Sequence, residues 1–436
     1  MMFPRRWRVP LGGCDCYLLA LEDHMRRAGQ GRHVGVTFLE LGEGFSLPSL
    51  VEAAARFAAA HPLLGAHLQR RLPGSIPHWL ADSAPKIEVV SHPAEADAHA
   101  LAESLLTGNW DGFLRFDCLS AERGTTILMS WSHLLFDARG VECVLSEVAR
   151  LAASGHERPP LRQSWGVHSP RPSGLLRQLS EVRPFIDRHY ELKRSDVRSL
   201  APPPATPSAP RCRFLRFSPE ETDVVNALAR RATGGIFLTP YFLAMAMRAH
   251  AEVLKSRGVR EGALQCAIAT QGRRRDTGEP IFQNQVSQLF FTLDLHETHS
   301  LDAATTALQD QFATMMKQKT DVAFLIMVNW MRRLPLPAYR RFLRHAASGN
   351  ITSFFHAHTG AFLPHHTTFC GAPLRNGWHA PSVSQPPGTG IFLSESNGTL
   401  TMTLSWRERA LAPAEVDLLF TRMRADLLGV ANPELA

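Results

Sequence analysis

A histidine and an aspartate four residues apart, His133 and Asp137, stand between a predicted strand and a predicted helix. The residues before them, 126–131, are β-prone and mostly apolar, which is typical of a strand buried on both faces. From about Gly140, apolar residues recur at helical spacing. An imidazole at the end of a rigid strand can take a proton from a hydroxyl or an amine as general base. The alternative is a half-buried histidine beside an aspartate that caps the helix.

The elements around this pair predict a mixed α/β chain in two halves. A chain of 436 residues is too long for one ordinary core. Residues 1–155 form the half that carries His133, and residues 211–436 form the other half. Between them, residues 156–210 are rich in proline and read as a crossover linker with a charged helical piece around 175–194.

Three segments of the second half have clear local signals. Asn397-Gly398 predicts the turn of a hairpin over 390–405, and Pro413 opens a closing helix to about Leu428. The run of ten apolar residues at 322–331 is compatible with a buried helix, with the lining of an acyl pocket, or with contact at a membrane surface.

Composition limits the class of protein. The chain is 44% hydrophobic and 20% charged, as expected of a globular protein. Seven cysteines, an odd number scattered along the sequence, do not form a disulfide framework, so a reducing cytoplasm is the simpler expectation. The N-terminus lacks the apolar region of an export signal, and no apolar run approaches the roughly 18 residues of a membrane span.

The net charge of +7 comes from dispersed arginine clusters, the most notable being Arg273, Arg274 and Arg275. No nucleic-acid module accompanies them, so we expect no nucleic-acid partner. A basic surface suits an anionic small molecule or an acidic carrier protein, although many of these arginines need be no more than solvated surface groups.

The histidines of the C-terminal half include a candidate metal site. Alternating residues on a strand place His356 and His358 on one face, with His365, His366 and Cys370 following. Their spacing matches no standard zinc pattern, and with 20 histidines in the chain local clusters arise by chance. We therefore expect no metal.

The segment around His133 resembles the HxxxDG signature of thioester-dependent acyltransferases of the chloramphenicol-acetyltransferase-like fold. That superfamily includes condensation domains, wax ester synthases and alcohol acetyltransferases. Other stretches resemble it too: 15–22 (DCYLLALE), 47–68 (LPSLVEAAARFAAAHPLLGAHL) and 112–118 (GFLRFDC). The resemblance implies two similar mixed-sheet α/β subdomains with a cleft or tunnel between them.

The resemblance also implies roles for single residues. His133 would be the general base, reached by donor and acceptor from opposite ends of the tunnel, and Asp137 would brace its loop by pairing with an arginine. Gly65 replaces the arginine frequent in the family, so Arg273 or Arg275 could substitute. Ala138 replaces the usual glycine. Ser132 stands where condensation domains carry a first histidine, which favours the single-histidine branches.

Further substrate or oxyanion candidates follow from the same resemblance. They are Ser132, Asn284, in a segment that resembles the family's G-N motif with Gln283 in place of glycine, and Ser353, in a predicted strand at 351–355. Arg273, Arg274 and Arg275 are candidates for the phosphates of a phosphopantetheine arm, or for the brace of Asp137.

The function predicted on this basis is acyl transfer from acyl-CoA or an acyl carrier protein to a hydroxyl or amine. Two alternatives stay open: a condensation-like enzyme that joins two carrier-bound substrates, and a non-catalytic relative that binds a carrier or lipid. We expect no bound cofactor, because the thioester is a co-substrate. The expected partners are an acidic carrier in trans, a small-molecule or lipid acceptor and, at most, a peripheral membrane contact.

Overall fold

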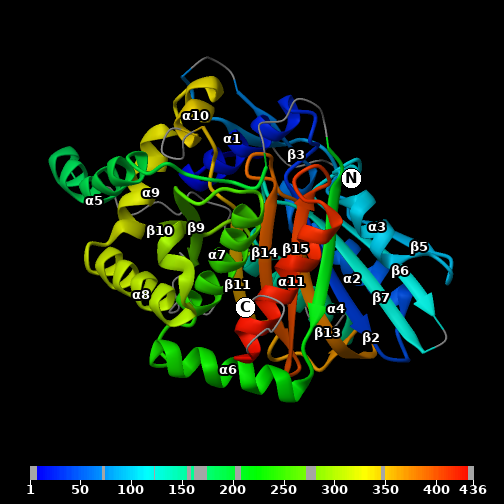
Figure 1. The fold of residues 1–436 in the computed structure, drawn as a ribbon. Helices are drawn as coiled ribbons and strands as arrows, with labels where there is room; N and C mark the ends of the chain where they lie inside the picture. Colours follow the sequence, from blue (N-terminus) through cyan, green and yellow to red (C-terminus); the bar gives the residue numbers. More distant parts are fainter. Residues whose placement is uncertain are drawn as a thin grey trace.

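The computed structural model describes residues 7–70, 74–121, 123–154, 159–161, 174–201, 208–271, 281–344 and 349–430. Two six-stranded sheets stand side by side in it (Figure 1). The first sheet has the order β12 (Thr368–Phe369), β13 (Ala372–Pro381), β2 (Val34–Leu41), β7 (Gly124–Ser132), β6 (Leu114–Ala121) and β5 (Glu88–His92). The second has the order β10 (Val286–Asp294), β9 (Ala263–Gln271), β11 (Phe355–Ala361), β14 (Thr389–Ser396), β15 (Thr399–Arg407) and β8 (Pro210–Arg216).

Strand β7, which leads to His133, is buried on both faces as its sequence predicts. Ile127 and Met129 belong to the core with helices α2 (Leu47–Ala60) and α4 (Ala138–Ser154). Leu128, between them, belongs to the core with α3 (Ala98–Leu105) on the opposite face. The period-two alternation of a strand therefore anchors β7 in two separate apolar layers.

The second sheet is covered by four helices: α6 (Pro219–Thr233), α7 (Thr239–Ser256), α8 (Leu301–Lys317) and α11 (Pro413–Leu428). Figure 1 shows α11 in red in front of the central strands, with α8 in yellow-green toward the left. Helix α7 is buried over most of its length, so its Met and Phe stripe is core, as expected. The predicted hairpin turn is present, with Asn397 and Gly398 at positive φ.

The C-terminal half of the chain contributes strands to the first sheet. Strand β13, from the C-terminal half of the sequence, pairs antiparallel with β2 of the first sheet, and Trp378 lies opposite Phe38. Across to the second sheet, Asn376 Nδ2 donates to Thr401 Oγ1 of β15 at 3.3 Å. The two sheets are thereby joined by strand pairing and a side-chain hydrogen bond, in addition to the linker that connects the two halves of the chain. The mixed α/β fold with two similar sheets agrees with the fold class expected from the sequence.

The remaining elements close the molecule around α1 (Gly13–Arg27). Helix α9 (Thr320–Met331) approaches α1 so closely that the Gly13 N–H donates to Asn329 Oδ1 at 3.0 Å. Phe324 and Val328 of α9 pack with Phe185 of α5 (Leu175–Lys193). The apolar run at 322–331 is thus largely a packed helix. The other elements are the small sheet β1 (Trp7–Pro10), β4 (His78–Ala81) and β3 (Ala66–Gln69), with α5 (Leu175–Lys193), α10 (Leu336–Leu343), η1 (Pro62–Gly65) and η3 (Leu295–His299). Within the described residues, no helix combines the length and apolarity that a membrane crossing requires.

Candidate active site

His133 follows directly on β7, in the short turn before α4. Its backbone N–H donates at 2.9 Å to the carbonyl of His33, which is the residue that precedes β2. Since β2 and β7 are paired along the whole of β2 in the centre of the first sheet, strand pairing fixes the backbone position at which His133 begins.

Two aromatic side chains hold the His133 ring. The imidazole of His33 is stacked on it, with ring centroids 4.4 Å apart and planes at 23°. The indole of Trp131 meets it edge-on at 5.1 Å. Trp131 is itself fixed, because its Nε1–H donates to Thr37 Oγ1 at 3.1 Å. His33 was missed from the sequence, since it lies a hundred residues from His133 and only strand pairing brings the two together.

The surroundings keep His133 neutral. Burial lowers its pKa from the ordinary value, and the negative charge of Asp137 works in the opposite direction. His33 has its pKa lowered well below the ordinary value, first by burial and then by His133 and Arg407. The His133 ring nevertheless keeps part of its surface accessible, and its Nδ1 is buried with no hydrogen bond of normal geometry among the described residues. A neutral, partly accessible imidazole is the form that a general base requires.

Asp137 ties the start of α4 to the second half of the chain. One carboxylate oxygen accepts the N–H of Gly140 at 2.7 Å, and the other accepts the N–H of Gln285 at 2.8 Å. The side chain is 3% exposed. Asp137 therefore caps α4, which is one of the two roles that the sequence predicts for it. It also forms a hydrogen bond that links the two halves of the chain. An arginine partner stays a prediction, because Arg273, Arg274 and Arg275 lie outside the described residues.

Asn284 also links the second half of the chain to the His133 turn. Its backbone N–H donates to the carbonyl of Leu135 at 3.2 Å, and its side-chain Nδ2 donates to the carbonyl of His133 at 3.1 Å. Next to it, Gln283 forms an isolated β-bridge with Phe136. Residues 283–285 thus run alongside the His133–Asp137 turn and hold its backbone at both ends.

The first turn of α1 backs this segment and was not predicted as part of the site. The Cys14 thiol donates to the Val286 carbonyl at 2.8 Å. Asp15 accepts the Gly12 N–H at 2.9 Å and also interacts with the Asn284 side chain. Burial raises the pKa of the Asp15 carboxyl to about 6. A titratable carboxyl therefore stands behind Asn284, close enough to Asp137 for the two charges to interact.

The two serine candidates occupy buried positions. The Ser132 hydroxyl accepts the Leu134 N–H at 3.4 Å, and the Ser353 hydroxyl accepts the Gln265 N–H at 2.8 Å. Both side chains are inaccessible to solvent. Ser353 lies just before β11, so the strand expected at 351–355 begins only at its last residue. Contact of Ser132, Asn284 or Ser353 with a substrate stays a prediction.

The described histidines of the C-terminal half carry no metal-ligand set. Burial lowers the pKa of His356 to about 3 and that of His358 to about 4, so both imidazoles are neutral. Among the described residues, one group has ligand atoms close enough for a metal, formed by His99, Glu103 and Cys212. Glu103 already accepts from Arg211 at 2.7 Å and from the Cys212 N–H at 3.1 Å, which accounts for its position without an ion.

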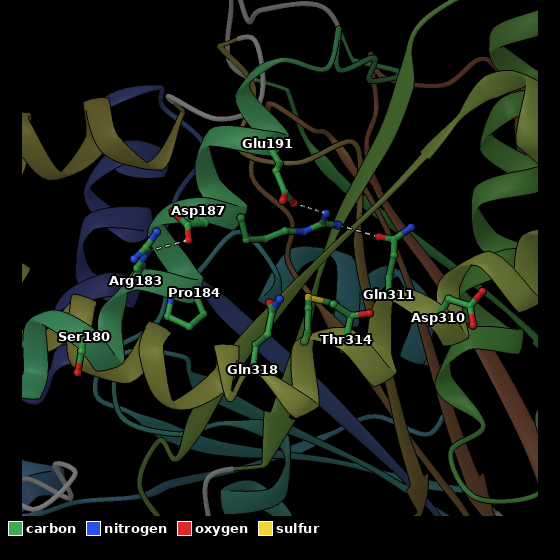
Figure 2. A pocket seen from close by; sticks show the side chains of 11 residues that line it. Ser180, Arg183, Pro184, Asp187, Glu191, Asp310, Gln311, Thr314 and Gln318 are labelled. Atoms are coloured by element: carbon green, nitrogen blue, oxygen red, sulfur yellow. Dashed lines mark hydrogen bonds and ion pairs between the residues drawn. The ribbon is translucent and has the colours of Figure 1, made fainter.

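A cavity of about 500 Å³ between α5 and α8 lies apart from these residues (Figure 2). Figure 2 shows Glu191 and Gln311 reaching toward the same guanidinium, that of Arg188. Arg188 also donates to the Phe290 carbonyl at 2.9 Å. Since these hydrogen bonds use its donors within the protein, Arg188 offers little to a ligand in this cavity.

Comparison with known proteins gives the fold. No protein-family model matches the sequence, and no curated protein matches it either. Among solved structures, the trichothecene 15-O-acetyltransferase TRI3 of Fusarium sporotrichioides is similar with a TM-score of 0.74 and 14% identity, covering 97% of this chain and 95% of that one. The first condensation domain of the calcium-dependent antibiotic synthetase has a TM-score of 0.68 at 14% identity, covering 97% and 96%. The epimerization domain of the third module of tyrocidine synthetase B has a TM-score of 0.65 at 11% identity, covering 98% and 96%.

The chain therefore has the chloramphenicol-acetyltransferase-like fold that acetyltransferases and condensation domains share. The resemblance predicted from the sequence is confirmed at this level, over nearly the whole chain. Assignment to the single-histidine branch stays a prediction.

Proposed function

We propose that this protein is an acyltransferase that moves an acyl group from a thioester to a hydroxyl or amine, with His133 as general base. The observation that carries the proposal is the state of His133, whose imidazole is neutral and partly accessible. The rings of His33 and Trp131 pack against this imidazole, and hydrogen bonds from both halves of the chain hold the His133 backbone. Structural relatives of the same fold include an acetyltransferase and condensation domains, which supports this reaction class.

In the proposed reaction, His133 takes the proton from the acceptor hydroxyl or amine as that group attacks the thioester carbonyl. The tetrahedral intermediate then collapses, the carbon–sulfur bond breaks, and the departing thiolate takes the proton from the imidazolium. Asp137 supplies negative charge that favours the transient imidazolium. Because its carboxylate is held by two backbone N–H groups, Asp137 acts as a positioning residue and an electrostatic partner rather than as a proton relay.

The donor is proposed to be acyl-CoA or a phosphopantetheinyl carrier protein. Arg273, Arg274 and Arg275 are proposed to lie near its phosphates, since they precede the segment that contacts the His133 turn. The net charge of +7 is compatible with an acidic carrier acting in trans. The acceptor is proposed to be a small molecule or a lipid.

A donor and acceptor screen tests this function. Release of free thiol is measured with acyl-CoA and acyl-carrier donors of several chain lengths, against alcohols and amines, with product formation confirmed by mass spectrometry. Transfer from a thioester to a free acceptor supports the proposal. Turnover with carrier-bound donor and carrier-bound acceptor alone would indicate a condensation-like enzyme instead. Binding without turnover across the screen would indicate a non-catalytic relative.

A further inference from the structure

A second cavity, of about 400 Å³, lies over the helical layer of the second sheet, between α7, α11 and η3. It is lined by Arg248 and Lys255 of α7, Arg260 of the following loop, Arg422 of α11, and two histidines of η3. Glu252 is the one acidic side chain that lines it. Four cationic groups thus line the cavity with one carboxylate, and the carboxylate of Asp426 lies beside two of the four. None of the lining residues holds the His133 turn.

The deepest of these cations is incompletely paired. Arg248 is 8% exposed, and its Nε is buried without a hydrogen-bond partner among the described residues. Its one ion-pair partner among them is Asp426, at 3.4 Å, and Arg422 shares the same carboxylate, also at 3.4 Å. Charge-assisted hydrogen bonds of this type are normally about 2.7–2.9 Å long. One carboxylate at this distance leaves most of the donors of two guanidinium groups unused.

The exposed cations of the cavity are unpaired as well. Lys255 and Arg260 form no side-chain hydrogen bond or ion pair with any described residue. Arginines elsewhere in the same layer behave differently: Arg257 forms a two-bond pair with Glu415 at 2.6 and 2.7 Å, and Arg213 pairs with Asp417 at 2.6 Å. Compared with Arg213 and Arg257 of the same layer, the cations of this cavity therefore keep more of their donors free.

We propose that this cavity is a binding site for a small phosphorylated anion, with Arg248 and Arg422 donating from below and Lys255 and Arg260 from the rim. Guanidinium groups match phosphate because their planar fork donates two parallel hydrogen bonds and stays charged. The volume falls within the range of small-ligand pockets. This site goes beyond the proposed acyl transfer and does not depend on it, because no residue is shared with the His133 turn.

The shared chemistry is the phosphate ester, and two sources supply it: a free phosphorylated metabolite or the nucleotide end of coenzyme A. Isothermal titration calorimetry of the full chain with pyrophosphate, with 3′,5′-ADP and with coenzyme A distinguishes them. Similar affinities for all three indicate a general phosphate site. Affinity for 3′,5′-ADP and coenzyme A at least about tenfold above that for pyrophosphate indicates the coenzyme.

Matched variants locate the site. Lys255→Gln and Arg260→Gln are each expected to weaken binding at least about fivefold, and binding to the unmutated chain is expected to weaken as salt rises. Lys317 is an exposed lysine on α8 outside the cavity, so Lys317→Gln is the control with the same charge change. Arg248→Gln is expected to remove binding, and Lys255→Gln remains decisive if that buried substitution prevents folding.

The proposal is overturned if none of the three anions binds at low salt, or if Lys317→Gln weakens binding as much as Lys255→Gln does. Binding of an acidic carrier protein, sensitive to Lys255→Gln and accompanied by no small-anion binding, would also overturn it and assign the surface to a protein partner.

Discussion

His33 and His133 stack face to face at 4.4 Å, although one precedes β2 and the other follows β7. The stack exists because these central strands are paired neighbours, which places the two residues opposite each other at the same end of the strand pair. Charged groups surround the pair on several sides: Glu22 accepts the His33 N–H at 3.4 Å, while Arg407 and Asp137 act on His33 and His133 respectively. We take the His33 ring to be the surface against which the His133 imidazole is oriented.

Removing the His33 ring should lower turnover more than replacing it with another ring. An aromatic stack contributes roughly 0.5–1.5 kcal/mol, which corresponds to up to about tenfold in rate if it is lost in the transition state. We expect His33→Ala to lower kcat about five- to tenfold with little change in KM, and His33→Phe to retain more than half of the activity. Steady-state kinetics check this. If His33→Phe were as impaired as His33→Ala, the role of His33 would lie in its nitrogens and not in stacking.

Asp137 should be required for stability as well as for activity. Asp137→Ala leaves the N–H groups of Gly140 and Gln285 without their acceptor, and each buried unsatisfied group costs about 1–3 kcal/mol. We expect the free energy of unfolding to fall by about 2–5 kcal/mol, and by less for Asp137→Asn, which keeps one acceptor oxygen. Urea denaturation measures this. An unchanged unfolding midpoint for Asp137→Ala would contradict the fastening role.

The close contact between Gly35 and Trp131 allows the packing around His133 to be tested without changing a residue that would touch the substrate. A Cβ on Gly35 would lie 2.4 Å from the Trp131 ring, so Trp131 must move, and Trp131 in turn contacts His133. We expect Gly35→Ala to destabilise the protein by about 1–3 kcal/mol, as overpacking does, and to reduce kcat. Gly174→Ala is the control, because its Cβ would meet no atom within 4 Å. Equal melting temperatures for the two variants would contradict the packing described.

Asp15 should make stability depend on pH. Its folded pKa is raised to about 6 from the ordinary 3.8, so the folded state binds the proton more tightly. The corresponding stability is fully present below 3.8 and is lost as the pH rises through about 6. Asp15→Asn removes this dependence and keeps an acceptor for the Gly12 N–H. Since the carboxyl is partly exposed, we expect the variant to gain about 1–2 kcal/mol relative to the unmutated protein between pH 4 and pH 8. Denaturation curves of both proteins at pH 4 and pH 8 test this. If the free energy of unfolding changed equally in the two proteins between these pH values, Asp15 would titrate normally.

The sequence predicted those parts of the site that depend on local pattern. Buried β7, the turn with His133 and Asp137, and the amphipathic α4 follow one another in the chain, so hydrophobic periodicity predicted these elements, whereas the role given to His133 followed from the family resemblance. The stack of His33 on His133 and the support from Cys14 and Asp15 depend on pairing between distant segments, which leaves no local signal. The same holds for β13, whose sequence does not show that it joins the first sheet rather than the second.

Comparison of His133→Ala with His365→Ala tests the central claim most directly. His365 is an exposed residue outside the His133 turn, so its substitution controls for the loss of an imidazole. On the donor and acceptor that give turnover, kcat/KM should fall about 100-fold or more for His133→Ala, with its melting temperature within a few degrees of the unmutated value, and should stay unchanged for His365→Ala. Near-full activity of a folded His133→Ala variant would contradict the assignment of His133 as the general base.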